Sequence, residues 1–369
     1  MSKLYVLTKR EVGSYSDRRN VRHARSRDFN FDEESVVQNS VMKAAWYEKK
    51  GQAAAVLIVG EQPVPVPRAG EVLIRVRASG VNPSDTKARQ GARGNNAMPF
   101  PLIIPHQDGA GEVVAAGSPA EQSWVGQRVW FYEAQLGRPL GAAAEYVALP
   151  IGQVSPLPDA VSFEEGACLG VPAMTAHRCV FADGPVEGKT VFVSGGAGAV
   201  GRYAIQFAKL GGATVIASVS REAQAQSAAA AGADLIVYRS DDIVARVREF
   251  TGKDRGVDRF VEVAFGANID AIMALLAPRG VVATYASDAV PEPTLPFWPL
   301  VMLDAAIRFV LVYVMDAAAH AAAAQAISEA LAAGRLTHSL AARYPLDRIA
   351  EAHAALESGE VVGKIVILT

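Results

Sequence analysis

A glycine-rich stretch at residues 190–201 constrains the possible folds of this chain more than any other feature of its sequence. It reads Thr-Val-Phe-Val-Ser-Gly-Gly-Ala-Gly-Ala-Val-Gly. The short apolar run at 191–193 predicts a buried parallel strand, and the apolar periodicity over 200–210 predicts a helix directly after the glycines. The stretch therefore predicts a strand, a tight turn and a helix in immediate succession.

The glycines of this turn have the spacing of a dinucleotide-binding site. Gly196, Gly198 and Gly201 satisfy G-x-G-x-x-G, and Gly195 opens the turn. Glycine lets the backbone turn sharply and lets a pyrophosphate approach, while the amides and the dipole at the helix N-terminus bind the anion. A glycine turn with a purely structural role is the alternative, but a second predicted strand at 213–219 favours cofactor binding. The residues predicted to contact the cofactor here are Gly195, Gly196, Ala197, Gly198, Ala199 and Val200.

The second half of the chain alternates strands and helices, beginning at the helix N-cap candidate Ser162. Strands are predicted at 190–194, 214–219, 234–238, 258–264 and 280–286. This alternation, with apolar strands, predicts a doubly wound parallel sheet in an α/β fold. The chain is then predicted to end with a helix at 317–333, a strand at 340–344, a helix at 346–356 and a strand at 364–368.

The first half consists of short strands separated by glycine and proline. Strands are predicted at 42–46, 53–58, 71–78, 109–117, 126–131 and 142–149. This pattern predicts a small barrel or sandwich, and a length of 369 residues suits two domains. Residues 1–41 are predicted to be a polar extension; its basic segment at 18–27 could contact nucleic acid, but a solvated tail is the favoured interpretation.

The composition excludes several classes of partner. A formal net charge of −2 provides no basic field for nucleic acid or an anionic membrane. The apolar stretch at 307–315 is too short to span a bilayer, and two cysteines, Cys168 and Cys179, are too few for a disulfide framework. No secretory signal is recognised at the N-terminus. We therefore expect a soluble cytoplasmic protein without membrane or nucleic-acid partners.

The segment 305–315 is a strongly apolar, β-prone run at the expected edge of the parallel sheet. An uncovered edge of this kind would aggregate, so we expect a homodimer formed by strand pairing at this segment. Burial of the segment within one subunit is the alternative.

The order of the motifs resembles a known family. The motifs are Ala78-Ser-Gly-Val-Asn-Pro-Ser-Asp85, Asp108-Gly-Ala-Gly-Glu-Val-Val, Gly126-Gln-Arg-Val, Ala144-Glu-Tyr146, Leu157-Pro-Asp with Ser162-Phe-Glu-Glu-Gly-Ala, the glycine turn and Gly363-Lys-Ile-Val. On these motifs, residues 42–369 are similar to zinc-free medium-chain dehydrogenase/reductases of the quinone oxidoreductase (zeta-crystallin-like) family. The resemblance implies a GroES-like β-barrel catalytic domain (42–165 and 311–369) and an inserted NADP-binding Rossmann domain (166–310), with cofactor and substrate in the cleft between them.

The resemblance also indicates that no metal is bound. A catalytic zinc needs three Cys, His or carboxylate ligands. The positions of the family's zinc ligands fall on Asn82, Gln107 and Val171, which supply neither thiolate nor imidazole. The cysteine-bearing lobe for a structural zinc is missing as well. His106, beside one of these positions, is expected to be a core or cleft histidine rather than a ligand.

The second predicted strand indicates NADPH as the cofactor. NAD enzymes place an acidic residue at the end of this strand to bind the ribose 2′-OH, and this chain has Val219 there. Ser218, Ser220 and Arg221 suit a 2′-phosphate instead, although Ser220 as a helix N-cap beside a solvated Arg221 is the alternative. Tyr238 matches a family tyrosine that packs near the phosphate.

The remaining predicted site residues come from the resemblance. Thr175 matches the threonine that lies against the nicotinamide, and Asn82 and Asp85 match the loop that lines the active site. Lys87 stands where many of these quinone reductases have tyrosine; orienting a substrate oxygen and pointing to water are both open, and the second is favoured. Further predicted cofactor contacts are Phe265, Tyr285 and Lys364.

The predicted reaction is hydride transfer from NADPH to a quinone or other conjugated carbonyl without zinc. The cofactor supplies the reducing chemistry, and the protein supplies orientation and exclusion of water. An enoyl or alkenal reductase on the same scaffold is the first alternative. A non-catalytic NADPH- or RNA-binding protein is the second, since a fold does not determine a function.

Overall fold

The computed structural model describes residues 40–91, 97–252 and 255–369. The predicted N-terminal extension, including its basic segment, therefore lies almost entirely outside the described residues.

A six-stranded parallel sheet forms one half of the molecule, with strand order β10-β9-β8-β11-β12-β13. Its strands are β8 (Thr190–Val193), β9 (Thr214–Val219), β10 (Leu235–Tyr238), β11 (Val257–Glu262), β12 (Leu276–Thr284) and β13 (Ala306–Phe309). All five pairings are parallel. The strands predicted between residues 190 and 286 are confirmed, and the strand order reverses between β8 and β11.

Helices cover both faces of this sheet because its strands are apolar on both sides. Val191 and Val193 of β8 belong to one hydrophobic cluster, whereas Phe192 between them belongs to another on the opposite face. The first cluster includes residues of α5 (Gly170–Phe181), α6 (Ala199–Leu210), α7 (Glu222–Ala230) and α11 (Ala317–Ala332). The second includes residues of α8 (Ile243–Thr251), α9 (Phe265–Leu275) and, at its margin, α10 (Phe297–Met302). The molecule therefore has the predicted doubly wound layer arrangement.

A mainly antiparallel seven-stranded sheet forms the other half, in the order β14-β15-β3-β4-β5-β7, with β6 also paired to β3. Its strands are β3 (Glu71–Val81), β4 (Asp108–Ala116), β5 (Arg128–Phe131), β6 (Tyr146–Pro150), β7 (Val154–Pro156), β14 (Leu340–Pro345) and β15 (Lys364–Leu368). A separate pair consists of β1 (Val41–Trp46) and β2 (Ile58–Pro63). The helices beside these sheets are α2 (Ala53–Val56), α3 (Pro83–Gln90), α4 (Phe163–Gly166) and α12 (Ile349–Glu357). Short 3₁₀ helices are η2 (Pro119–Trp124), η3 (Ile151–Gln153), η4 (Val312–Val314) and η5 (Leu346–Arg348).

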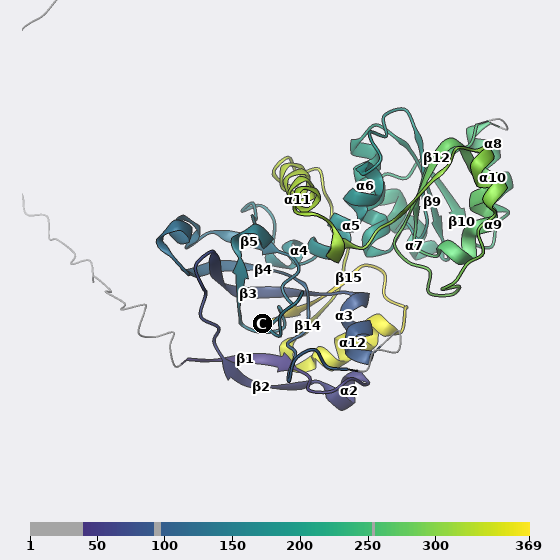
Figure 1. The fold of residues 1–369 in the computed structure, drawn as a ribbon. Coiled ribbons are helices and arrows are strands. Elements are labelled where there is room, and N and C mark those ends of the chain that lie inside the picture. The colour runs from purple at the N-terminus through teal and green to yellow at the C-terminus, as the bar shows by residue number, and fades with distance from the viewer. Residues whose placement is uncertain (1–39, 92–96, 253–254) are drawn as a thin grey trace, which may run out of the picture.

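The strand β15 returns to the antiparallel sheet as an interior strand. In Figure 1 the yellow β14 and β15 lie beside the blue β3. β15 pairs with β3 with Ile365 opposite Val81, on one side, and with β14 on the other. The parallel-sheet half is thus inserted between two parts of the antiparallel half.

Two predicted strands are corrected. Residues 53–56 of the strand predicted at 53–58 form the helix α2, because Ala53 and Val56 have helical spacing and are both buried where α2 packs against α12 and α3. The strand predicted at 305–315 ends at Phe309. Beyond it the chain turns into η4, where Val312 is buried in the core.

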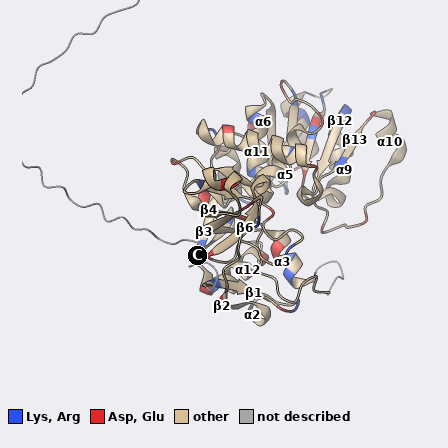
Figure 2. Ribbon diagram, turned by 60° about the vertical axis from the view of Figure 1, so that its left-hand side comes forward, with Lys and Arg blue, Asp and Glu red and all other residues tan. Residues whose placement is uncertain are grey.

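The described helices include none that is long and apolar enough to cross a membrane. Lys/Arg and Asp/Glu positions are interspersed over both halves of the molecule in Figure 2.

Candidate functional site

A cavity of about 510 Å³ lies at the carboxyl ends of β8, β9, β11 and β12. Parallel strands end at the same edge of a sheet, and the reversal of strand order between β8 and β11 leaves a crevice there. Asn82 and Pro83 of the antiparallel half also line this cavity. The cavity therefore joins the two halves of the molecule, and its size suits a small-molecule ligand.

At two positions the glycine turn has no space for a Cβ, and at a third its backbone conformation favours glycine. Gly195 has a φ of 67°, a left-handed conformation that favours glycine. A Cβ on Gly196 would lie 2.8 Å from the Cβ of Ala217, and one on Gly201 would lie 2.3 Å from the Gly195 carbonyl oxygen. Gly198 is the N-cap of α6, so the strand–turn–helix prediction is confirmed. The predicted residues that line the cavity here are Gly195, Ala197, Gly198, Ala199 and Val200.

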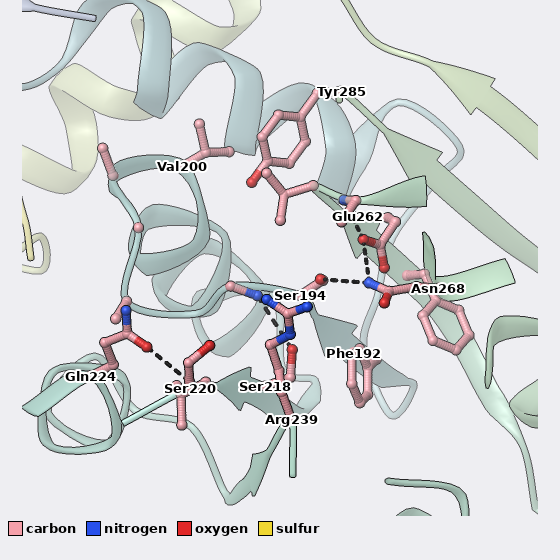
Figure 3. A pocket seen from close by; sticks show the side chains of 18 of the residues that line it. Phe192, Ser194, Val200, Ser218, Ser220, Gln224, Arg239, Glu262, Asn268 and Tyr285 are labelled. Carbon is pink, nitrogen blue, oxygen red and sulfur yellow. Dashed lines mark hydrogen bonds between the residues drawn. The ribbon is translucent and has the colours of Figure 1, made fainter. Parts of the chain in front are cut away.

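The end of β9 carries hydroxyls and a nearby cation. β9 ends at Val219, so no acidic side chain stands at this position. Ser218 and Ser220 line the cavity, and the Ser218 hydroxyl accepts a hydrogen bond from the Gly195 amide at 3.3 Å. Arg239, which follows β10, also lines the cavity beside them (Figure 3). Its guanidinium has no hydrogen bond or ion pair with another described residue, so it is available to an anion.

Several predicted cofactor residues do not line the cavity. The guanidinium of Arg221, at the N-cap of α7, donates to the carbonyl oxygen of Glu360 in the antiparallel half. The Tyr238 hydroxyl donates to Glu222 at 2.5 Å. Phe265, the first residue of α9, is buried in the core, and its ring packs edge-on against Phe309. Tyr285, in contrast, lines the cavity as predicted.

A buried polar network forms the wall of the cavity near β11. Glu262 accepts hydrogen bonds from the Ala264 amide at 2.6 Å and from the Asn268 side chain at 2.8 Å. Asn268 also donates to the Ser194 hydroxyl at 3.2 Å (Figure 3). Burial raises the pKa of Glu262 above its ordinary value. This network fixes the wall rather than presenting free donors.

On the antiparallel side, Asn82 is held by two charged residues. Its amide nitrogen donates to Asp108 at 2.7 Å, and its amide oxygen accepts from the Lys364 ammonium, which also lies 3.1 Å from Asp108. The other Asp108 oxygen accepts from the Val171 amide, at the start of α5, at 2.8 Å. Asn82, Asp108 and Lys364 are all buried, so this network connects the two halves beneath the cavity. Lys364 reaches Asn82 and does not line the cavity.

Asp85 and Thr175 lie behind the cavity wall. The Asp85 carboxylate accepts from the Asn82 backbone amide at 2.8 Å. Burial, and then the nearby Asp108 carboxylate, raise the pKa of Asp85 to about 7. The Thr175 hydroxyl donates to the Val171 carbonyl oxygen at 2.6 Å, one turn below the residues of α5 that line the cavity.

Two side chains of α3 reach across to the parallel-sheet half. The Lys87 ammonium lies 2.6 Å from the Asp288 carboxylate, and both side chains are partly exposed. The Ser84 hydroxyl lies 2.7 Å from the hydroxyl of Tyr313 in η4. Sequence reasoning did not select Ser84 or Tyr313. The only signals in the sequence were that Ser84 lies in the motif Ala78–Asp85 and that Tyr313 lies in the apolar 305–315 run.

The residues at the family's zinc positions do not fit a zinc ion. Asn82 is occupied by Asp108 and Lys364, and Val171 has no ligand atom in its side chain. The Gln107 amide pairs with Gln135, at 3.3 Å and 3.1 Å. Over residues 40–91, 97–252 and 255–369, no three His, Cys, Asp or Glu side chains are grouped so that they could hold a metal.

His106 is buried within the antiparallel half. Its Nδ1 lies 2.8 Å from the Ser79 hydroxyl, and its Nε2 lies 2.8 Å from Nε2 of His353. Burial holds the pKa of His106 well below its usual range, so the imidazole is neutral. Its structural environment is that of a core histidine.

Comparisons with known proteins agree with this arrangement. Residues 68–159 match the alcohol dehydrogenase GroES-like domain, and residues 231–367 match a family described as zinc-binding dehydrogenase. Human quinone oxidoreductase is 28% identical over 83% of this chain and 91% of its own length. Tomato 2-methylene-furan-3-one reductase is 34% identical over 55% of this chain and 53% of its own length. A mycobacterial protein solved in complex with NADPH is 30% identical, has a TM-score of 0.77, and is matched over 89% of this chain and 100% of that one.

Proposed function

We propose that this chain, which belongs to the medium-chain dehydrogenase/reductase family, is a zinc-independent oxidoreductase. The reaction is the transfer of hydride from NADPH to a quinone or another conjugated carbonyl compound. The observation that carries the proposal is the single cavity in which the glycine turn and Asn82 with Pro83 meet. A cofactor bound at the glycine turn and an acceptor bound beside Asn82 and Pro83 would lie in contact.

The residues at the cofactor end fit NADPH. The crowding around Gly201 excludes a side chain there, and the small residues of the turn leave its backbone accessible, which suits a pyrophosphate on the N-terminus of α6. Ser220 and Arg239 provide a hydroxyl and a cation at the end of β9, where a 2′-phosphate would meet Val219 rather than a carboxylate. When bound, NADPH supplies the hydride.

The chain itself orients and shields the reactants. Asp108 and Lys364 hold the Asn82 carboxamide in one orientation at the cavity wall, and Asp108 fixes the start of α5 opposite it. A site held by buried hydrogen bonds is already organised before the acceptor binds. Quinone reduction needs no dedicated acid, because solvent can protonate the reduced oxygen.

A conjugated enone is the second acceptor class. The similarity to tomato 2-methylene-furan-3-one reductase supports it, since the substrate in the name of that enzyme is a furanone with an exocyclic double bond. Both acceptors have a carbonyl oxygen that gains negative charge when hydride arrives, so the same pocket chemistry suits both.

The test is the oxidation of NADPH and of NADH by 1,4-benzoquinone and by cyclohex-2-enone, assayed separately. We expect turnover with NADPH. In the Arg239→Ala variant, the KM for NADPH should rise about tenfold while the KM for NADH stays unchanged, because one charge-assisted contact is lost. Arg221→Ala is the matched control and should change neither constant more than about twofold, because Arg221 already binds Glu360. Tight NADPH binding without turnover by either acceptor would exclude the proposed reaction.

We also propose a homodimer formed through the 305–315 segment. β13 is the last strand of the parallel sheet, and large apolar side chains are exposed around it: Phe309 72%, Val314 75% and Trp298 71%. An apolar edge of this kind is stabilised by pairing with a second copy. Light scattering should give twice the chain mass for the wild type and the monomer mass for Phe309→Lys, with Phe250→Lys on exposed α8 as the control.

The proposal includes a cytoplasmic location. Cys168 and Cys179 are both free thiols, as is usual in a reducing compartment. Fractionation of cells that produce the protein tests this.

A further inference from the structure

The loop that leads into β4 contains a strained backbone position. His106 has a φ of 79°, a left-handed conformation that favours glycine, and its side chain is fully buried. A non-glycine residue in this conformation costs free energy and persists only where the surrounding structure holds it there. The contacts of the His106 imidazole therefore show what the strain supports.

The His106 ring lies in the middle of a buried row of side chains, the histidine row, which runs from Ser79 through His106 and His353 to Arg89. Nδ1 of His106 lies 2.8 Å from the Ser79 hydroxyl, and its Nε2 lies 2.8 Å from Nε2 of His353 in α12. Nδ1 of His353 accepts a hydrogen bond from Nε of Arg89, in α3, at 3.3 Å. All four side chains are buried, so the row connects β3, the loop before β4, α12 and α3 away from solvent.

The arginine determines the direction of every hydrogen bond in the row. Burial holds the pKa of His106 well below its usual range. Burial, and then the Arg89 charge, lower the pKa of His353 to about 3, so both rings are neutral at pH 7 and each carries one N–H. An arginine can only donate, so the hydrogen of His353 is on Nε2 and points to His106. His106 then accepts on Nε2, carries its hydrogen on Nδ1 and donates to Ser79.

The start of the row is fixed by further contacts of Arg89. Its guanidinium also donates to the Gly51 carbonyl oxygen and to the Glu357 carboxylate of α12. The helices α3 and α12 lie side by side in Figure 1 and are in contact. With three acceptors around it, the guanidinium is held in one orientation, and the histidines cannot reverse their hydrogen bonds without losing the one from Arg89.

The histidine row and the cavity wall form one closed circuit of contacts. Arg89 is in the last turn of α3, and Asn82 is the N-cap of the same helix. Asp108, which accepts from the Asn82 amide at 2.7 Å, follows His106 by two residues. A change in the row therefore moves either the segment that carries Asp108 or the helix that Asn82 caps.

We propose that the histidine row positions the acceptor end of the cavity. It holds the strained loop in the conformation in which the Asp108 carboxylate meets the Asn82 amide, and so it determines how Asn82 is oriented at the cavity wall. Arg89, His353 and His106 are not among the residues that line the cavity, so they are positioning residues that act through Asp108. This inference rests on the proposed function and adds residues to it.

The direction of the row can be measured on the wild-type protein. Long-range ¹H–¹⁵N correlation spectra of the labelled histidines at pH 7 show which ring nitrogen carries the hydrogen. We expect the hydrogen on Nε2 of His353 and on Nδ1 of His106. The reverse assignment in either ring, or a doubly protonated ring, would overturn the proposal. The spectra need neither turnover nor a substitution.

The effect on Asn82 is tested with two substitutions of His353. His353→Phe keeps an aromatic ring and removes both nitrogens, whereas His353→Gln keeps one acceptor and one donor on the side chain. In His353→Phe we expect the side-chain amide resonance of Asn82 to shift and kcat with 1,4-benzoquinone to fall about tenfold, while the Kd of NADPH changes less than about twofold. In His353→Gln the resonance should return, and kcat should lie within about threefold of the wild type.

A matched control and a second variant complete the test. His177→Phe alters a histidine of α5 whose ring packs against Phe181 and Phe207, and it should change none of these values. His106→Gly places glycine at a φ that suits it and removes the ring, so it should shift the Asn82 resonance in a folded protein.

Three results of these substitutions would overturn the proposal. The first is an Asn82 resonance that stays in place in His353→Phe or in His106→Gly. The second is an equal loss of kcat in His353→Gln and His353→Phe, and the third is a loss of NADPH affinity as large as the loss of kcat, which indicates a general loss of structure. Absent turnover in the wild type, together with the expected spectra, would exclude only the proposed reaction.

Discussion

The two ends of the cavity are built in different ways. At the cofactor end, the glycine turn supplies one short stretch of backbone, and the ends of the parallel strands add side chains such as Ser218, Ser220 and Tyr285. At the acceptor end, it consists of side chains from both halves of the molecule, held by Asp108, Lys364 and the Ser84–Tyr313 pair. A backbone surface tolerates little change in shape, whereas a side-chain surface can change its chemistry while the fold is kept.

This difference separates binding from specificity. The glycine turn at the cofactor end is one short stretch of sequence, so a single added methyl group can disrupt it. The acceptor end depends on contacts between residues that are up to 282 positions apart, such as Asn82 and Lys364. The effects of substitutions at the two ends should therefore be detected by different measurements.

The largest expected effect is on the stability of the acceptor end, from Lys364→Met. The substitution leaves the Asp108 carboxylate buried beside Asp85 without its cation. Because a buried ion pair that loses one partner is strongly destabilised, the free energy of unfolding should fall by about 3–5 kcal/mol. Urea unfolding measures this loss. Lys43→Met is the control: its ion pair with Asp347 is exposed, so a loss of no more than about 1 kcal/mol is expected. Equal losses in the two variants would contradict the network described here.

At the cofactor end, Gly201→Ala should weaken NADPH binding about a hundredfold. The added Cβ would lie 2.3 Å from the Gly195 oxygen, so the turn must move away from the position in which its amides face a pyrophosphate. Fluorescence titration with NADPH measures the affinity, and a hundredfold loss corresponds to about 2.7 kcal/mol of binding free energy. Gly198→Ala in the same turn meets the same oxygen only at 3.3 Å and should lose less than fivefold. Similar affinities for both variants would argue against backbone crowding as the cause.

The acceptor end also differs from the cofactor end in how its stability depends on pH. The pKa of Asp85 is raised to about 7 in the folded protein, so between about pH 4 and pH 7 the folded state holds a proton that the unfolded state has lost. Stability attributable to Asp85 should thus fall as the pH rises through this window, by at most about 1.4 kcal/mol per pH unit. Asp85→Asn should remove this decline. Urea unfolding of both proteins from pH 4.5 to pH 8 tests it, and parallel stability curves would contradict it.

The smallest effect is expected at the exposed bridge between the halves. The Lys87 and Asp288 side chains are 40% and 66% exposed, so their ion pair should contribute no more than about 1 kcal/mol. Lys87→Met should lower the unfolding free energy by this amount at low salt and leave it unchanged in 1 M NaCl, where surface charges are screened. A loss that persists in high salt would indicate packing rather than charge.

The sequence predicted the strand, turn and helix at the cofactor end because their determinants are local. The strand at β8, the turn and α6 are consecutive, and the strands around them have the apolar pattern of a parallel sheet. The edge strand was predicted too long, since the apolar character of 305–315 continues past Phe309 while Val312 is buried in the core instead of the sheet.

Side-chain positions at both ends were harder to predict. Arg221 follows β9 as predicted, but its long side chain turns to the Glu360 carbonyl, and Arg239 from the next strand lines the cavity. The Ser84–Tyr313 contact joins residues 229 positions apart, and neither residue has a motif that announces the other. Such pairs follow from the docking of the two halves, which no local pattern encodes.

The position of β15 has a consequence for how the chain reaches its native state. β15 lies between β3 and the edge strand β14 in the antiparallel sheet, although it follows all the strands of the parallel sheet in the sequence. During translation the parallel sheet has all its strands well before this one emerges, and domains fold as units from the N-terminal side where they can. The antiparallel half must therefore keep Ala78–Val81 of β3 unpaired on that side until β15 has emerged from the ribosome, and its assembly is a slow, non-local closing step.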